Sequence, residues 1–200
     1  MALYNAGNKY LFFHIFRTGG LSLRTTIDGE EILGGHVLAR DVKKHFADQG
    51  RSAEWDSALK FVMVRNPFDW QVSTYQYILQ APAHDFHTLV SAMSLTEYLR
   101  WYGEKIREPR FYGTNAYASQ SEFIDDDQGN QIVDMVLRFE ELPDCIHQFR
   151  GKLGLPPAEM PHINITQRKP DYREYYDDES RELVERIFAE DLERFGYGFE

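Results

Sequence analysis

The sequence contains little cysteine, fewer basic than acidic residues and no long apolar run. Cys145 is the only cysteine among 200 residues, which excludes an internal disulfide, and the helical pattern around it predicts that it is buried. Lysine and arginine total 22 against 32 aspartates and glutamates, and the resulting net charge of −10 disfavours a nucleic-acid partner, whose binding needs a basic surface. No apolar run reaches the roughly 18 residues of a membrane span and no N-terminal signal segment is visible, so we expect a cytoplasmic protein.

What the chain does contain is an alternation of strand-like and helix-like segments. A hydrophobic content of 42% supports a sizeable core, and we expect a single domain over residues 1–200 without repeats. Predicted strands cover 11–15, 61–64 and 133–139, and predicted helices cover 21–28, 37–46, 67–79, 95–106, 141–153 and 178–195. This order predicts a three-layer α/β fold with a parallel central sheet flanked by helices, in which ligands bind beyond the carboxyl ends of the strands.

The first candidate site is the segment that follows the predicted strand 11–15. There Arg17 precedes a glycine pair, Gly19-Gly20, and Ser22 lies near the start of the predicted helix. Glycine lets backbone N–H groups approach an anion closely, a helix N-terminus favours negative charge, and arginine adds a fixed cation. The segment therefore predicts a site for a phosphate-like or sulfate-like group, although it is not a Walker A motif. The alternative is a tight strand-to-helix turn that binds nothing.

The second candidate site follows the predicted strand 61–64. Arg65 lies at the end of this strand, Pro67 fits the first turn of a helix, and Asp69 and Ser73 are four residues apart on one helix face. Arg65 and Ser73 can converge on one phosphate, the arginine through its forked guanidinium and the serine through its hydroxyl. The alternative is a local ion pair between Arg65 and Asp69, with Ser73 as a small helix residue.

Together these two segments resemble the carbohydrate-type branch of the sulfotransferases that use 3′-phosphoadenosine-5′-phosphosulfate (PAPS). The first motif of that family is His-Ile-Pro-Lys-Thr-Gly-Gly-Thr-Ser, and the second is Arg-Asn-Pro followed by an acidic residue and a serine. The residues of this chain that agree with the motifs are His14, Ile15, Thr18, Gly19, Gly20, Ser22, Arg65, Asn66, Pro67, Asp69 and Ser73. The resemblance extends toward the C-terminus through Arg138-Phe139-Glu140, Asn164 and the segment 171–199.

The resemblance implies a P-loop-NTPase-like sulfotransferase fold with PAPS as the cofactor and 3′-phosphoadenosine-5′-phosphate (PAP) as its product. In the family, the first loop holds the 5′-phosphosulfate and the second segment holds the 3′-phosphate. The cofactor-binding residues implied here are Arg17, Thr18, Gly19, Gly20, Leu21, Ser22, Arg65 and Ser73. Arg168, in a basic segment over 167–169, is expected either to cover the 3′-phosphate or to lie in an exposed charged loop. No spacing of acidic residues indicates a metal site.

Three positions depart from the family's first motif. Phe16 replaces a proline, Arg17 replaces a lysine and Leu21 replaces a threonine. Arg17 matters most, because the family lysine contacts the bridging region of the phosphosulfate and assists the departing phosphate. A guanidinium keeps the positive charge and binds two oxygens at once, but it cannot readily donate a proton. We therefore expect Arg17 to supply electrostatic stabilisation without general-acid assistance.

Sulfuryl transfer to a hydroxyl needs a base that removes the hydroxyl proton, and histidine is the natural candidate. His36 is the first candidate, because related proteins of this branch carry a Gly-His pair at a similar place and its histidine is taken as the base. A loop or cap histidine is the alternative for His36, and a structural role is the alternative for His14, the second candidate. The aromatic residues between 81 and 117 are candidates for a wall against the acceptor, or for ordinary core and surface positions: Phe86, Tyr98, Trp101, Tyr102, Phe111, Tyr112 and Tyr117.

The sequence thus predicts a sulfotransferase whose partner is a hydroxyl-bearing acceptor, namely a carbohydrate, a lipid or a small metabolite. Two alternatives stay open. A nucleotide phosphotransferase, such as a small-molecule kinase, is disfavoured because the Walker lysine and an acidic Mg²⁺ site are missing. A PAP- or PAPS-binding protein with weak catalysis is favoured by Arg17 in place of the family lysine.

Overall fold

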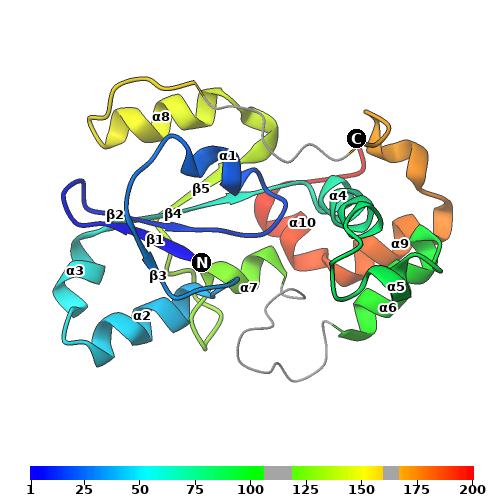
Figure 1. The fold of residues 1–200 in the computed structure, drawn as a ribbon, viewed down its shortest axis with the longest axis horizontal. Helices are drawn as coiled ribbons and strands as arrows, with labels where there is room; N and C mark the ends of the chain where they lie inside the picture. Colours follow the sequence, from blue (N-terminus) through cyan, green and yellow to red (C-terminus); the bar gives the residue numbers. More distant parts are fainter. Residues whose placement is uncertain (106–118, 160–166) are drawn as a thin grey trace. The chain divides into compact units, whose positions relative to one another are not determined.

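The computed structural model describes residues 1–105, 119–159 and 167–200, and these residues divide into two units (Figure 1). The first unit comprises Met1–Val64 and the described part of Arg110–Asn164. The second unit comprises the described parts of Arg65–Pro109 and Ile165–Glu200. Each unit has its own core, so the packing that positions a given side chain can be followed within one unit.

The first unit contains a five-stranded sheet in the order β3-β1-β2-β4-β5. β2, β4 and β5 are parallel, whereas β1 is antiparallel to both β2 and β3. The strands are β1 (Ala2–Asn5), β2 (Tyr10–Phe13), β3 (Glu30–Ile32), β4 (Leu59–Val64) and β5 (Met135–Arg138). The α/β class predicted from the sequence is confirmed, and the prediction of an all-parallel sheet is wrong.

The two strands that the sequence analysis missed explain this difference. β1 is joined to β2 by a turn over residues 6–9, and a connection this short can join only antiparallel neighbours. β3 lies at the edge of the sheet and consists of two exposed glutamates and one buried isoleucine, Ile32, so it carries almost no apolar signal.

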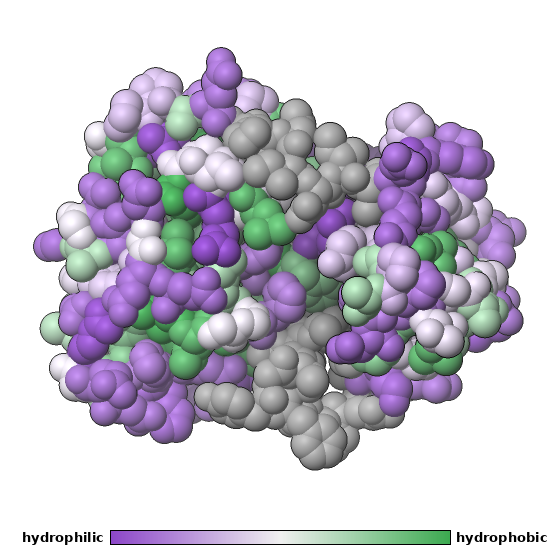
Figure 2. Space-filling model, in the orientation of Figure 1, coloured by the Kyte–Doolittle hydropathy of each residue, from purple (hydrophilic) through white to green (hydrophobic). Residues whose placement is uncertain are grey.

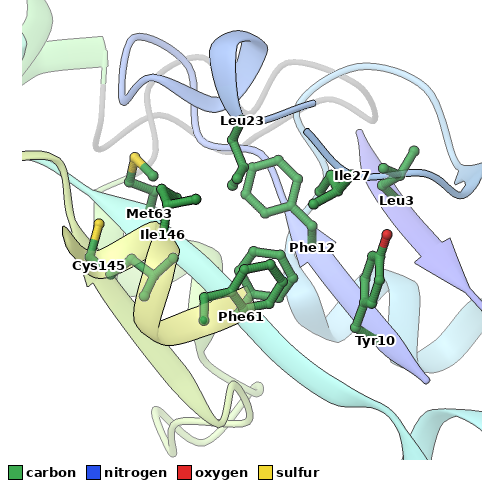
Figure 3. Packing of buried hydrophobic residues seen from close by; sticks show 11 residues of the cluster. Leu3, Tyr10, Phe12, Leu23, Ile27, Phe61, Met63, Cys145 and Ile146 are labelled. Atoms are coloured by element: carbon green, nitrogen blue, oxygen red, sulfur yellow. The ribbon is translucent and has the colours of Figure 1, made fainter. Parts of the chain in front are cut away.

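Alternating side chains of the strands cover both faces of this sheet. On one face, the ring of Phe61 packs 5.1 Å from that of Phe12 and 3.8 Å from that of Phe149, measured between centroids. This face is covered by α1 (Gly20–Arg24) and α8 (Asp144–Lys152), whose buried side chains join the cluster in Figure 3. Cys145 of α8 is among them, and burial raises the pKa of its thiol to about 11.

On the opposite face, aromatic residues of the sheet contact two helices. The ring centroid of Tyr4 lies 5.2 Å from that of Phe46 in α2 (Ala39–Asp48), and that of Phe13 lies 6.1 Å from that of Trp55 in α3 (Ser52–Ser57). Helices therefore flank the sheet on both sides. The unit also contains α7 (Gln120–Ile124) and the 3-10 helix η2 (Phe139–Glu141).

The second unit is built from helices. They are α4 (Pro67–Gln80), α5 (His87–Val90), α6 (Leu95–Lys105), the 3-10 helix η3 (Tyr172–Tyr175), α9 (Asp178–Ile187) and α10 (Ala189–Phe195). Its core contains Phe188, whose ring lies 5.6 Å from that of Trp70 and 5.7 Å from that of Tyr102.

Two predicted helices of this unit, 67–79 and 95–106, agree closely with α4 and α6, although Ile106 lies outside the described residues. The single helix predicted over 178–195 is wrong, because the chain leaves the helical conformation at Phe188, where φ is −114° and ψ is 27°. This break divides the segment into α9 and α10 and coincides with the burial of the Phe188 ring in the core.

The surface of the protein is largely hydrophilic. Hydrophilic residues dominate the face shown in Figure 2, as expected for a sequence in which 27% of the residues are charged. In the parts of the chain that the structure describes, no helix combines the length and the apolar character that crossing a membrane requires.

Candidate functional site

The glycine turn of the first unit has a fixed local conformation. Arg17 and Gly19 both adopt the left-handed region, with φ of 58° and 83°. Between them, the buried Thr18 hydroxyl donates a hydrogen bond to the carbonyl of Ile15 over 2.9 Å. A left-handed conformation is uncommon for a residue with a side chain, so the turn imposes it on Arg17. Ser22, also buried, lies in the helix that begins at Gly20, and Leu21 is exposed.

Both glycines of this turn are required by the packing beneath it. A Cβ atom at Gly19 would lie 3.0 Å from Cδ2 of Phe139, and one at Gly20 would lie 2.1 Å from Cδ2 of His14. The observed α1 has five residues instead of the eight predicted, and so short a helix has only a small dipole. The interpretation as a tight strand-to-helix turn therefore accounts for both glycines by itself, and an anion role depends on Arg17 and the backbone N–H groups of the turn.

The two candidate histidines lie together in the first unit. The ring centroids of His14, which follows β2, and His36, which precedes α2, are 5.7 Å apart. Burial lowers the pKa of His14 to about 3, and the neighbouring His36 lowers it further in the same direction. Burial also lowers the pKa of His36 to about 4, against a hydrogen bond to the backbone of His14 that raises it. Both rings are therefore neutral at pH 7 and can accept a proton, although such low pKa values make weak bases.

The second candidate segment begins the second unit, and its motif residues fix the start of a helix. Pro67 is the first residue of α4, and the Asn66 side chain accepts a hydrogen bond from the backbone N–H of Phe68 over 3.0 Å. The Nδ2 group of Asn66 also donates to the carbonyl of Gly198 over 2.8 Å. Asparagine and proline of the motif therefore have structural roles, and Arg65 and Ser73 are the residues of this segment that the sequence predicts to bind a ligand.

Arg65 and Arg168, 103 positions apart in sequence (168 − 65 = 103), meet on one carboxylate. Nε and Nη2 of Arg65 donate to Oδ2 of Asp69 over 2.7 and 2.5 Å, and Nη1 of Arg168 lies 2.6 Å from Oδ1 of Asp69. The local ion pair between Arg65 and Asp69 that we considered as an alternative is thus formed. Arg168 lies in a loop in which Gln167 and Lys169 are exposed, but its own side chain is only 14% exposed. Ser73 is buried one turn further along α4.

Several contacts that the sequence did not indicate hold the Arg168 segment. The backbone N–H of Gln167 donates to the Gln80 side chain over 3.0 Å, and the same side chain donates back to the Gln167 carbonyl over 2.7 Å. On the other side, the backbone N–H of Lys169 donates to the Tyr175 hydroxyl over 2.8 Å. The i, i+4 spacing signalled the contact of Asp69 with Arg65, but nothing local indicates that Gln80 or Tyr175 supports Arg168.

The predicted site residues thus form one set in each unit. The first unit contains His14, Arg17, Thr18, Gly19, Gly20, Leu21, Ser22 and His36, and the second contains Arg65, Ser73 and Arg168. Of the acceptor-wall candidates, Tyr98 and Tyr102 are buried in the second unit, whereas Phe111, Tyr112 and Tyr117 lie outside the described residues, as does Asn164. Within the described ranges, no group of three histidine, cysteine, aspartate or glutamate side chains is placed to hold a metal ion.

Comparisons with known proteins found no family model, no curated protein and no solved structure that matches this chain. The functional interpretation therefore depends on the residues and their geometry.

Proposed function

We propose that this protein is a PAPS-dependent sulfotransferase that moves the sulfuryl group from PAPS to a hydroxyl of a carbohydrate, a lipid or a small metabolite in the cytoplasm. The observation that carries the proposal is that Arg168 contacts Asp69, the same carboxylate that Arg65 binds in the segment that resembles the 3′-phosphate motif. Two arginines and one aspartate leave an excess of one positive charge, and forked guanidinium groups match the oxygens of a phosphate. A P-loop-NTPase-like sulfotransferase topology remains part of the proposal.

In this proposal, the residues of the first unit act on the reacting group. PAPS supplies an activated sulfuryl group and a phosphate leaving group. Arg17 and the backbone N–H groups of the glycine turn bind the phosphosulfate, and Arg17 stabilises the charge that develops on the departing phosphate oxygen. His36, neutral at pH 7, accepts the acceptor's hydroxyl proton as the oxygen–sulfur bond forms and the sulfur–phosphate oxygen bond breaks. His14, which bonds to His36 through its backbone, positions that ring.

Two observations favour a catalytically weak PAP- or PAPS-binding protein as a second candidate. Arg17 replaces the family lysine and cannot readily donate a proton, and the lowered pKa of His36 makes it a weaker base than an ordinary histidine. Both effects reduce the rate of transfer without reducing the affinity for the nucleotide.

The test is the thermal stability of the protein with PAP, with ATP and without ligand, all in EDTA. At 100 times its dissociation constant a ligand stabilises the fold by about 2.7 kcal/mol, which for this chain length raises the melting temperature by roughly 5–11 °C. We expect this rise with PAP, its loss in Arg65→Ala, and its retention in Arg173→Ala, which removes an exposed arginine of the same unit. No rise with PAP would refute the proposal, and a rise with ATP alone would favour a kinase-like protein.

Turnover then separates the two candidates that bind PAP. Release of PAP from PAPS in EDTA, stimulated by hydroxyl acceptors, supports the transferase. Binding of PAP without any PAPS turnover supports the catalytically weak binding protein.

A further inference from the structure

The 3-10 helix η3 and the tyrosine that follows it connect the two segments that supply the paired arginines. The Tyr175 hydroxyl accepts a hydrogen bond over 2.8 Å from the backbone N–H of Lys169, the residue after Arg168. The Tyr176 hydroxyl donates a hydrogen bond over 2.8 Å to the carbonyl of Phe68, in the first turn of α4. One short stretch of chain is thus bonded both to the Arg168 segment and to the start of α4.

The ring of Phe199 lies at the junction between this stretch and α4. Its centroid is 4.9 Å from that of Phe68, and 5.8 and 5.4 Å from those of Tyr172 and Tyr176. All three pairs meet edge to face, which is a geometry that aromatic rings prefer. The guanidinium carbon of Arg181 lies 5.0 Å from the same centroid. Phe199 therefore packs against both sides of the junction and holds them together.

The main chain is also held on each side of Phe199. The carbonyl of Gly198 accepts a hydrogen bond over 2.8 Å from Nδ2 of Asn66, whose own side-chain oxygen caps α4. The main-chain oxygen of Glu200 accepts a hydrogen bond over 2.6 Å from the Tyr172 hydroxyl. These two bonds connect the segment that carries the Phe199 ring to α4 and to η3, the same two elements that the ring contacts.

The position of Arg168 depends on this junction more than that of Arg65 does. Arg65 and Asp69 are four residues apart, so their contact is local, whereas Arg168 reaches Asp69 only while its segment lies against α4. Holding the backbone of a long side chain in place reduces the conformational entropy that a ligand must pay to order it. We infer that Phe199 is a positioning residue for nucleotide binding, which keeps Arg168 within reach of the phosphate that Arg65 binds. The inference rests on the proposed function, which supplies the ligand.

The test is a double-mutant cycle on the affinity of the intact protein for PAP, measured by titration calorimetry. Phe199→Ala should weaken PAP binding by about tenfold in the wild type but by about twofold or less in an Arg168→Gln background, where no guanidinium remains to be positioned. Phe199→Leu, which keeps an apolar side chain at the junction, should retain most of the affinity. In Phe199→Ala the KM for PAPS should rise while kcat stays nearly unchanged, because the residues proposed to act on the reacting group belong to the first unit.

A matched control removes a different phenylalanine ring from the same unit. Phe195 is also partly buried and lies at the end of α10, and Phe195→Ala should leave the affinity for PAP unchanged. If Phe199→Ala does not fold, Tyr176→Phe is the second variant. It removes the hydrogen bond to the Phe68 carbonyl while keeping the ring, and its effect on affinity should depend on Arg168 in the same way.

The outcomes separate this inference from the proposed function. Unchanged affinity in Phe199→Ala, or equal losses with and without Arg168, would overturn the inference, because Phe199 would then only contribute to the fold. If the wild type does not bind PAP, the sulfotransferase proposal is refuted, and the same cycle is measured with methyl phosphate, which lacks the nucleoside. A loss of methyl phosphate affinity that depends on Arg168 then supports the inference, whereas independent losses or no binding of methyl phosphate overturn it.

Discussion

Replacing Gly20 with alanine tests whether the glycine turn is built around the ring of His14. The added Cβ would lie 2.1 Å from Cδ2, 2.7 Å from Nε2 and 3.0 Å from Cγ of that ring, far inside the roughly 3.5–4.0 Å of normal carbon contacts. The ring cannot easily move away, because it is 8% exposed and packs against Phe12 and His36 at centroid distances of 6.2 and 5.7 Å.

The expected change in the unfolding free energy of Gly20→Ala is the sum of two opposing contributions. Overpacking a filled site destabilises by about 1–3 kcal/mol or more, and alanine in a helix is favoured over glycine by about 1 kcal/mol at most. We expect the overpacking to dominate and Gly20→Ala to lose about 2 kcal/mol of unfolding free energy. In a chain of this length, such a loss lowers the melting temperature by roughly 4–8 °C.

Thermal melts of a double-mutant cycle test whether the clash with the His14 ring causes this loss of stability. In a His14→Ala background the ring is absent, so Gly20→Ala should become neutral or slightly stabilising, with a coupling energy of about 2 kcal/mol. Gly151→Ala is the matched control, because Gly151 lies in α8 with nothing within 4 Å of its added Cβ, and it should stabilise by about 0.5–1 kcal/mol. A Gly20→Ala protein that melts at or above the wild-type temperature, or that loses the same stability without the His14 ring, would refute this reasoning.

The remaining predictions concern the two histidines. His36→Ala should lower the turnover of PAPS by roughly 10²–10⁴-fold while the calorimetric affinity for PAP stays nearly unchanged, and near-normal turnover would exclude His36 as the base. Because burial lowers the pKa of His36 to about 4, the acid limb of the pH profile of kcat should lie near pH 4. A limb near pH 6.5 would contradict the lowered pKa of His36. His14 has a pKa of about 3 when folded against 6.5 ordinarily, so between these values the unfolded state binds more protons and the unfolding free energy falls as the pH is lowered. Denaturant titrations at several pH values should show a flatter pH dependence for His14→Gln than for the wild type.

Local sequence signals predicted the position of several site elements well. The start of α4 is encoded by Asn66 as cap and Pro67 as first residue, and both act through groups within two residues along the chain. The contact of Arg65 with Asp69 is also local, because four residues make one helical turn. The strand-to-helix turn around Gly19 was equally visible, since an apolar run followed by glycines indicates a turn whatever surrounds it.

Other features depend on partners that are distant in sequence. The direction of β1 and the pairing of the polar edge strand β3 depend on hydrogen bonds to neighbouring strands, and the apolar pattern of a single segment does not contain them. The break at Phe188 accompanies the burial of its ring beside Trp70, although the sequence favours a continuous helix.

The sequence by itself determined the α/β class, the turn after β2 and the helix start after Arg65, because each follows from periodicity, capping or backbone preference within one segment. Only the tertiary structure decided that His14 and His36 share one buried environment and that Arg168 shares Asp69 with Arg65. These pairings depend on the packing of separate elements. The burial that lowers the histidine pKa values arises only when those elements pack together.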